Sequence, residues 1–351
     1  MGSEIKNTNL FGEEILIDNG VDIVLFDEQD VIQTAFNDFR QRGFPYPSLP
    51  LFRCKMELNA LANLNQADCL NSRVGYRIAD TYNRHRFHSA AINMSSPYDS
   101  FMNDTRLLKV LSKQYASAKT FEYGYLGFMS LVNGTQACSN FRPAFAKMLY
   151  NKYSPENGVV FDSSTGYGGR LVGFLGSHCS AYHGTDPNTL THEANTKMSG
   201  DLKNNKHVFL YNSPIEDLNI DHLIEQCDFS FTSPPYFKKE LYSKEDTQSC
   251  NRYPEYQSWI DGFLKPMISK QFQVLKDGAI CIINIEDVSI SKKKYPLVEP
   301  TIAVAVESGF EWIKNDVFPM QPRTRMVEGV KVVEYATETV IVLKKNKSKI
   351  S

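Results

Sequence analysis

The sequence predicts an α/β protein built on a doubly wound, mostly parallel sheet of seven strands, preceded by a largely helical region. From about residue 116, short apolar segments alternate with helical stretches, which is typical of a parallel sheet covered by helices. A glycine-rich turn follows the first apolar segment, and a proline-rich turn follows the fourth. Both turns fall where a doubly wound sheet binds its ligands, beyond the carboxyl ends of its strands.

Seven apolar segments are predicted to be the strands. They are short and rich in Val, Ile and Phe, as buried strands are. The last two are predicted to close the sheet as an antiparallel pair. The segments are residues 159–161, 181–185, 208–211, 228–231, 279–285, 310–318 and 339–343.

Two helices are predicted before the first strand. Residues 121–132 are apolar enough for a buried helix. Residues 142–150 form the next one, with Pro143 in its first turn. Proline fits there because the N–H that it lacks would have no partner within the helix.

The N-terminal third has a different pattern. A helix is predicted over 27–42, with an apolar stripe at helical spacing, Asp27 as its N-cap and Gly43 at its end. Another helix is predicted near 55–64, after a proline-rich stretch that cannot be helical.

These patterns divide the chain into three parts. Residues 1–115 are predicted to be an accessory region and a candidate for target recognition. Residues 116–345 are predicted to be the α/β domain, and residues 346–351 a disordered tail.

The composition is that of a globular cytoplasmic protein. Of 351 residues, 42% are hydrophobic, and no apolar run approaches the roughly 20 residues that span a membrane. The net charge of −2 excludes a globally basic nucleic-acid binder but allows an enzyme with one positive face. The seven cysteines lack CxxC or zinc spacing, which predicts reduced thiols and no metal site.

The glycine-rich turn reads Asp162-Ser163-Ser164-Thr165-Gly166-Tyr167-Gly168-Gly169-Arg170. A strand, a glycine turn and a helix in this order bring the backbone close to a ligand. Leu171 stands where a dinucleotide fingerprint needs glycine, and no Walker A lysine follows. Asp186, at the end of the next strand, can accept both hydroxyls of a ribose. The turn alone leaves dinucleotides and S-adenosylmethionine open as ligands.

The proline-rich turn, Thr232-Ser233-Pro234-Pro235-Tyr236, has the chemistry for methylating an amine. The Ser233 hydroxyl and the Pro234 carbonyl can accept the N–H bonds of an amino group on a base, and the prolines hold both acceptors rigid. Tyr236 offers a face on which an extruded base can stack. Methylation at carbon 5 of cytosine needs a thiolate, and the sequence has no Pro-Cys pair.

These motifs resemble those of the DNA amino-methyltransferase family, over about residues 135–345. The proline-rich turn looks like the family's (Asp/Asn/Ser)-Pro-Pro-(Tyr/Phe) motif, in a form commoner among cytosine enzymes. The glycine turn aligns with the Asp-Pro-Phe-x-Gly-x-Gly motif, with Ser163-Ser164 in place of Pro-Phe. Asn140-Phe141-Arg142-Pro143 sits where the family often has Thr-Gln-Lys-Pro before a helix that closes over the cofactor.

The resemblance implies a class I methyltransferase fold, S-adenosylmethionine as cofactor, and double-stranded DNA with one base flipped out as substrate. Cytosine N4 is favoured over adenine N6. A restriction enzyme and a second copy of the chain stay open as partners. The implied catalytic residues are Ser233, Pro234, Pro235 and Tyr236. The implied cofactor residues are Asp162, Ser164, Gly166, Gly168, Arg142, Asp186, Asn212, Ser213 and Thr232, with Glu216 and Asp217 near the adenine ring.

The sequence departs from the family in motif order. The glycine turn precedes the proline turn by only about sixty residues, whereas most Thr-Ser-Pro-Pro-Tyr enzymes have the reverse order. Target recognition is therefore expected from the N-terminal region, from residues 237–257, or from both. The candidates for phosphate contacts are Arg84, Arg86, Lys238 and Lys239, and those for the base pocket are Tyr242 and Tyr253.

Two other functions stay open. RNA and protein-glutamine methyltransferases use an Asn/Asp-Pro-Pro-Tyr loop in the same place, and Ser233 argues against them. A nucleic-acid-binding protein without catalysis would bind no cofactor, and the intact glycine turn argues against it.

Overall fold

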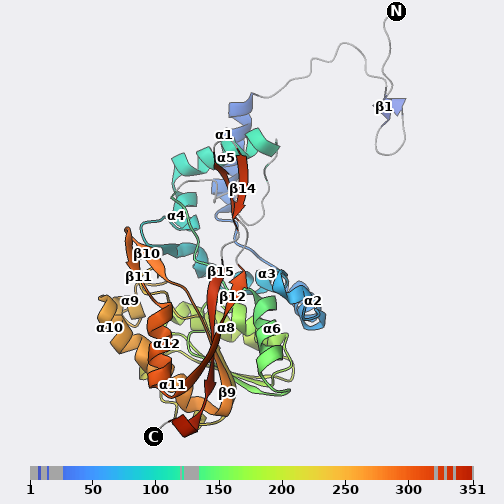
Figure 1. Cartoon of the computed structure of the whole chain (residues 1–351). Coiled ribbons are helices and arrows are strands. Elements are labelled where there is room, and N and C mark those ends of the chain that lie inside the picture. Colours follow the sequence, from blue (N-terminus) through green and yellow to red (C-terminus); the bar gives the residue numbers. More distant parts are fainter. Residues whose placement is uncertain are drawn as a thin grey trace, which may run out of the picture.

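The computed structural model describes residues 7–8, 14–15, 27–118, 121, 134–319, 323–327, 330–334 and 337–349 (Figure 1). The helix predicted at 121–132 lies outside these residues except for Phe121. Within the described chain, no helix has the length and apolar character to span a membrane. The seven cysteines are all buried and free of disulfides.

The central sheet has seven strands in the order β12-β15-β9-β7-β4-β5-β6. The strands from β9 to β6 are parallel, and β15 is antiparallel to both of its neighbours. The predicted fold class is confirmed, including the antiparallel closing pair. The strands are β4 (Val159–Asp162), β5 (Ala181–Thr185), β6 (His207–Tyr211), β7 (Cys227–Thr232), β9 (Leu275–Ile285), β12 (Phe310–Pro319) and β15 (Thr337–Lys345).

Helices cover both faces of the sheet (Figure 1). Successive strand residues point to opposite faces, so Ile283 joins one apolar core and Ile282 the other. The first core lies under α11 (Lys265–Val274) and α12 (Val298–Glu307). The second lies under α6 (Pro143–Tyr153), α7 (Gly169–Leu175) and α8 (Thr189–Leu202). Burial on both faces explains why the inner strands read as apolar runs, whereas the edge strands β6 and β12 are partly exposed.

Shorter elements surround the sheet. Two of its loops contain antiparallel hairpins, β10–β11 after β9 and β13–β14 between β12 and β15. Their bounds are β10 (Val288–Ile290), β11 (Lys293–Tyr295), β13 (Arg323–Val327) and β14 (Val330–Glu334), with β1 (Asn7–Thr8) and β2 (Glu14–Ile15) near the N-terminus. The remaining short helices are α9 (Ser249–Arg252) and α10 (Tyr256–Trp259), the latter joined to α11 by a π-helical turn at Ile260–Leu264.

The N-terminal region is largely helical, as predicted. The helix predicted at 27–42 is α1 (Glu28–Arg42), with Gly43 at a φ of 79° just beyond its end. The helix predicted near 55–64 is α2 (Leu51–Asn63), which begins earlier because Pro50 occupies the N-cap. It is followed by α3 (Tyr76–Tyr82), α4 (Pro97–Met102) and α5 (Asp104–Ala118).

The N-terminal helices belong to two different cores. Leu61 of α2 and Ile78 of α3 are fully buried in the core that also contains α6 and α7. Phe39 of α1 and Leu111 of α5 lie in a separate cluster. The boundary near residue 115 stays a prediction, and α2 and α3 are packed as part of the α/β core. At the other end of the chain, Lys347–Lys349 form a short 3-10 helix where a tail was predicted.

Candidate active site

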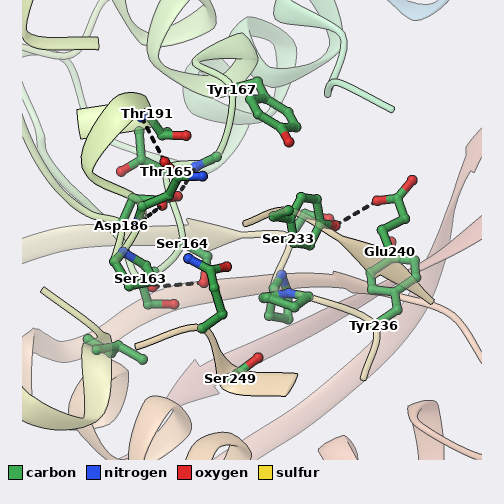
Figure 2. Close-up of a pocket in the computed structure, with 18 of the residues that line it drawn as sticks. Ser163, Ser164, Thr165, Tyr167, Asp186, Thr191, Ser233, Tyr236, Glu240 and Ser249 are labelled. Atoms are coloured by element: carbon green, nitrogen blue, oxygen red, sulfur yellow. Dashed lines mark hydrogen bonds between the residues drawn. The ribbon is translucent and has the colours of Figure 1, made fainter. Parts of the chain in front are cut away.

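A pocket lies beyond the carboxyl ends of β4, β5 and β7, where the two predicted turns meet. Ser163, Ser164, Thr165, Asp186 and Thr191 line one side, and Ser233, Tyr236 and Glu240 line the other (Figure 2). The predicted catalytic residues, Ser233 to Tyr236, all line it. Two predicted motifs that are sixty residues apart therefore share one cavity, because β7 pairs directly with β4.

Asp162 supports the glycine turn from beneath and does not line the pocket. Its carboxylate is fully buried and receives hydrogen bonds from Arg170 Nε at 2.8 Å and Tyr182 Oη at 2.7 Å. The Ser164 N–H also donates to it, at 3.1 Å. Its acceptor positions are thus directed at the protein, and the predicted contact of Asp162 with the cofactor stays a prediction.

The glycines of the turn have different roles. Gly166 lines the pocket with a φ of 59°, a conformation that favours glycine. Gly168 has a φ of 79°, and a Cβ there would lie 2.5 Å from Asn195 Oδ1. A Cβ on Gly169 would lie 2.0 Å from the Phe141 carbonyl oxygen. Gly168 is therefore required for packing the turn and does not line the pocket, contrary to its predicted role.

Asp186 has the geometry expected for binding two hydroxyls. One carboxylate oxygen accepts the Gly166 N–H at 2.8 Å, and the other accepts the Asn188 N–H at 2.9 Å. Each oxygen keeps a further acceptor position. Burial, partly offset by these two backbone bonds, raises the pKa of the carboxyl to about 6. The carboxylate is therefore mostly ionised at neutral pH and faces the pocket.

Three other predicted cofactor residues point elsewhere. Arg142 bonds the Pro319 carbonyl and lies 4.6 Å from the centroid of the Phe318 ring. Thr232 is fully buried at the end of β7. Ser213 turns its hydroxyl to the Pro214 carbonyl oxygen at 3.0 Å. None of them lines the pocket. The polar groups of Arg142 and Ser213 bond neighbouring loops, whereas Thr232 Oγ1 is buried without a hydrogen-bond partner among the described residues.

The loop after β6 contributes Glu216 to the pocket wall. Its carboxylate is partly buried, with one oxygen 3.3 Å from Arg252 Nη1 and the other without a hydrogen-bond partner among the described residues. Burial raises the pKa of this carboxyl. Asn212 is exposed beside Thr189, and Asp217 pairs with Arg252 at 2.7 Å. Both were predicted to lie at the cofactor, and neither of them lines the pocket.

The catalytic loop is held by residues from β9 and β15. Asn284 Nδ2 donates to Ser233 Oγ at 3.3 Å and also lies 2.7 Å from Tyr236 Oη. Glu338 accepts from both Tyr236 Oη, at 3.0 Å, and Asn284 Nδ2, at 2.8 Å. The serine hydroxyl thus has a fixed donor on its far side. Burial, with the Glu338 charge beside it, raises the pKa of Tyr236 well above its ordinary value, so this phenol stays protonated.

Phe237 anchors the end of this loop. Its φ is 52°, which costs a bulky residue about 1–3 kcal/mol. The side chain is 4% exposed and packs within 6.0 Å of the Trp259 ring and 5.1 Å of the Tyr295 ring, centroid to centroid. Burial of the ring holds the chain in this strained turn directly after the two prolines.

A buried carboxyl closes the pocket opposite the glycine turn. Glu240 accepts the Tyr242 hydroxyl at 2.6 Å and the Ser139 N–H at 3.2 Å, and burial raises its pKa. Tyr242 lines the pocket as predicted, and Lys239 lines it with its ammonium 5.0 Å from the Tyr236 ring centroid. Tyr253 does not line it; it packs against Gly262 instead.

The four residues predicted to contact phosphates differ in how exposed their side chains are and in whether they are paired with other residues. Arg86 is 2% exposed and paired with Asp80 at 2.7 Å, so it is a structural residue, and the prediction is wrong for it. Arg84 is exposed and lies 3.3 Å from Ser48 Oγ. Lys238 and Lys239 flank the pocket and are partly exposed.

Comparison with known protein families finds a match in the C-terminal third of the chain. Residues 227–350 match the model of a family described as DNA methylase. They hold β7, the catalytic loop, β9 and β15. This segment is therefore similar to the family that the motifs predict. The match supports S-adenosylmethionine as the cofactor. No curated protein sequence matches the chain.

Several solved structures are similar to this chain at low identity. TrmN from Thermus thermophilus is 13% identical with a TM-score of 0.39, over 58% of this chain and 49% of that one. YcgJ from Bacillus subtilis is 11% identical with a TM-score of 0.40, over 58% of this chain and 99% of that one. A SAM-dependent methyltransferase from Methanosarcina mazei is 11% identical with a TM-score of 0.37, over 56% and 97%. The chain thus spans about half the length of TrmN.

The lining of the pocket fits this cofactor. Asp186 keeps one acceptor position on each oxygen for two ribose hydroxyls. The unpartnered oxygen of Glu216 suits an exocyclic amine on the adenine ring. Ser164, Thr165 and Gly166 line the same side of the pocket. Bound there, the cofactor supplies an electrophilic methyl group.

The N-terminal region contributes to this wall through His85. One ring nitrogen lies 2.8 Å from Thr191 Oγ1, and the ring centroid lies 5.5 Å from that of Tyr167. Burial, with Arg86 and His88 nearby, lowers the pKa of His85 to about 4, so the ring is neutral at pH 7. Thr191 and Tyr167 line the pocket, and the accessory region therefore supports the cofactor wall directly.

Sequence reasoning missed Asn284, Glu338, Glu240 and the role of Arg170. Asn284 had a detectable signal, since it is a polar residue within an otherwise apolar strand. Glu338 and Glu240 had none, because a glutamate beside an apolar segment is an ordinary surface residue in a sequence. Arg170 was recognisable only as the residue after the glycines.

Asp186→Asn is expected to weaken S-adenosylmethionine binding by about 10- to 100-fold, because charged hydrogen bonds contribute about 1.5–3 kcal/mol. Calorimetric titration measures this, with Asp221→Asn, an exposed position outside the pocket, as the matched control. In the wild type, affinity should fall as the pH drops through about 6, where the carboxyl protonates.

Whereas cofactor affinity should fall as the pH drops, the contribution of Asp186 to the free energy of unfolding of the cofactor-free protein should rise. Since the pKa of Asp186 is raised on folding, protonation favours the folded state, and its contribution improves as the pH falls from about 6 toward 4. Weaker binding at low pH thus cannot be attributed to unfolding at this residue. Equal affinities of Asp186→Asn and wild type would remove Asp186 from the cofactor site.

Proposed function

We propose that this chain transfers a methyl group from S-adenosylmethionine to the exocyclic amine of a flipped-out base in double-stranded DNA, with cytosine N4 favoured over adenine N6. The supporting observation is the shared pocket. Ser233 stands across one cavity from Asp186 and the glycine turn (Figure 2), and Pro234 lines the same cavity. The match of residues 227–350 to the DNA methylase family supports DNA as the substrate.

The residues of the loop address the chemical difficulty of the reaction. An amino group on a base is a poor nucleophile, because its lone pair is delocalised into the ring. Ser233 Oγ can accept one of its N–H bonds and the Pro234 carbonyl the other, which favours a tetrahedral nitrogen. With the cofactor bound, the amine nitrogen would take the methyl group as the bond from the methyl carbon to the sulfonium sulfur breaks. S-adenosylhomocysteine would be the leaving group, and the surplus proton of the nitrogen would pass to water.

Preorganisation lowers the cost of this geometry. Asn284 donates to Ser233 Oγ, which leaves a lone pair of that oxygen for the substrate. The two prolines and the buried Phe237 hold the loop in place before substrate arrives. Donors and acceptors fixed in this way need no reorganisation during the reaction.

The position of the loop supports base flipping. Pro234 is buried, and Tyr236 is tied to Glu338 inside the pocket. A base stacked in a duplex cannot bring its amine to acceptors at that depth, so it must leave the helix. Tyr236, Phe318 and Tyr242 offer aromatic walls for it. The serine at the head of the motif supports cytosine over adenine.

The test is methyl transfer by the purified full-length chain with labelled S-adenosylmethionine and plasmid DNA, followed by mass spectrometry of the nucleosides. N4-methylcytosine is expected. N6-methyladenine would overturn the choice of base, and transfer to RNA or protein without transfer to DNA would overturn the substrate. A flat calorimetric titration with the cofactor would support a binding protein without catalysis.

A further inference from the structure

Five lysines gather around the catalytic loop, two within its continuation and three on the β10–β11 hairpin. They are Lys238, Lys239, Lys292, Lys293 and Lys294. Among the described residues, none of the five forms an ion pair, whereas other lysines do. Those with a carboxylate partner are Lys197, Lys265, Lys276, Lys314, Lys345 and Lys347.

The tip of the hairpin places lysine in an unfavourable backbone conformation. Ser291 and Lys292 have φ values of 49° and 69°, as a two-residue turn with positive φ at both positions requires. Such turns favour Asn and Gly, and other residues cost about 1–2 kcal/mol each. The side chains of Lys292, Lys293 and Lys294 are all exposed. An exposed lysine kept at a strained tip is more consistent with binding than with packing.

Aromatic packing fixes the hairpin to the catalytic loop. The Tyr295 ring lies 5.1 Å from Phe237 and 5.5 Å from Tyr256, between centroids. Lys293 shares a strand face with Tyr295, and its ammonium lies 5.0 Å from that ring. The hairpin is thus held directly against the residue that follows the Pro-Pro-Tyr motif.

The accessory region meets the same edge of the pocket. The two-residue strand β3 (Ala90–Ala91) pairs with β8 (Glu240–Leu241), just after Lys238 and Lys239. Asn93 Nδ2 lies 3.5 Å from Ser291 Oγ at the tip of the hairpin. The two segments that carry the five lysines and the segment around Asn93 therefore contact one another at this edge. Figure 1 shows β10 and β11 on the side of the sheet toward α4.

The carboxylates nearest in sequence to the hairpin are engaged elsewhere. Asp287 accepts the Leu297 N–H at 2.7 Å and the Val298 N–H at 3.0 Å. Glu286 accepts from Thr339 Oγ1 at 2.9 Å. With a net charge of −2, the chain has no general excess of cations. Isolated exposed lysines occur elsewhere, but at this edge three follow one another in the hairpin and two more adjoin the catalytic loop. Rows of unpaired lysines beside a base pocket match a phosphodiester backbone.

We propose that the β10–β11 hairpin, together with Lys238 and Lys239, is the surface that binds the phosphates of the DNA strand beside the flipped base. This inference rests on the proposed function and names the element that holds its substrate. Contacts of this kind fix the register of the protein on the duplex without reading sequence.

The test is the triple variant K292E/K293E/K294E of the full chain, with two measurements. Fluorescence anisotropy with a labelled duplex should show binding weakened at least tenfold at 100 mM salt. The slope of log affinity against log salt concentration should flatten by about 1 to 3, because each lost phosphate contact removes about 0.9. In methyl transfer, KM for DNA should rise far more than kcat falls.

The matched control is K152E/K203E/K344E. These three lysines are also exposed and outside any ion pair among the described residues, but they lie near the amino ends of the parallel strands. The control should keep the wild-type salt slope. Both variants should bind S-adenosylmethionine like the wild type, which excludes misfolding. A hairpin variant with the salt slope and KM of the control would overturn the proposal.

The two proposals fail in different ways. If the wild type binds duplex DNA through the hairpin yet transfers no methyl group to it, the proposed function fails and the surface stands. If the wild type methylates DNA while the hairpin variant behaves as the control does, the surface fails and the function stands. Stronger loss of binding to single-stranded RNA than to duplex DNA would contradict the surface as stated.

Discussion

Ser233→Ala is expected to reduce methyl transfer to DNA by at least 100-fold, about 2.7 kcal/mol in the transition state. The reason is the loss of one of two fixed acceptors for the amine. Asn284 and Pro234 remain, so the loop keeps its shape but leaves one N–H of the substrate unpaired. Single-turnover kinetics with labelled cofactor and duplex DNA measures the effect on the chemical step.

The control for this variant is Ser213→Ala. Ser213 lies in the loop after β6, outside the pocket wall, and its hydroxyl reaches only the neighbouring Pro214 carbonyl in the described structure. It should transfer methyl groups at the wild-type rate. Both variants should bind S-adenosylmethionine within about twofold of the wild type. A Ser233→Ala variant that transfers methyl groups at the wild-type rate would contradict the role proposed for the catalytic loop.

Arg170→Leu is expected to destabilise the fold by about 3–5 kcal/mol, because it leaves the Asp162 carboxylate buried without its cation. Arg170 and Asp162 are 5% and 0% exposed and lie 2.8 Å apart, Nε to Oδ2. Domains of this kind have roughly 5–15 kcal/mol of stability in total. Urea unfolding should show the loss as a lower midpoint, and cofactor binding should weaken with it, since Arg170 also bonds the Ser164 carbonyl.

A surface pair offers the matched comparison. Lys197 and Asp201 also lie 2.8 Å apart, but the lysine is 69% exposed. Lys197→Leu should therefore change stability by less than about 1 kcal/mol. Replacing both partners in the double variant D162N/R170M should recover part of the loss, because no unpaired charge is then buried. If Arg170→Leu were as mild as Lys197→Leu, the pair would not be what holds the glycine turn.

The sequence determined the sheet and the place of its two functional loops. The inner strands are buried on both faces and therefore apolar, and the partly exposed edge strands β6 and β12 kept enough apolar residues to be readable as well. Glycines and prolines directly after such segments identified the turns at the carboxyl edge, because few other residues permit these backbone shapes. Ser233 and Asp186 were recognisable for the same reason, since each directly follows or ends a predicted strand.

Only the tertiary structure decided which polar groups face the pocket. Asp162 was predicted to contact the cofactor, but Arg170, eight residues on, turns its carboxylate into the protein. Asn284 and Glu338 reach the catalytic loop from 51 and 102 residues away, and sequence spacing does not encode such contacts. The position of the hairpin lysines beside the catalytic loop follows only from the packing of Tyr295 on Phe237. Local backbone conformation depends on neighbouring residues in the sequence. The direction of a side chain depends on the sheet order, which brings distant segments together.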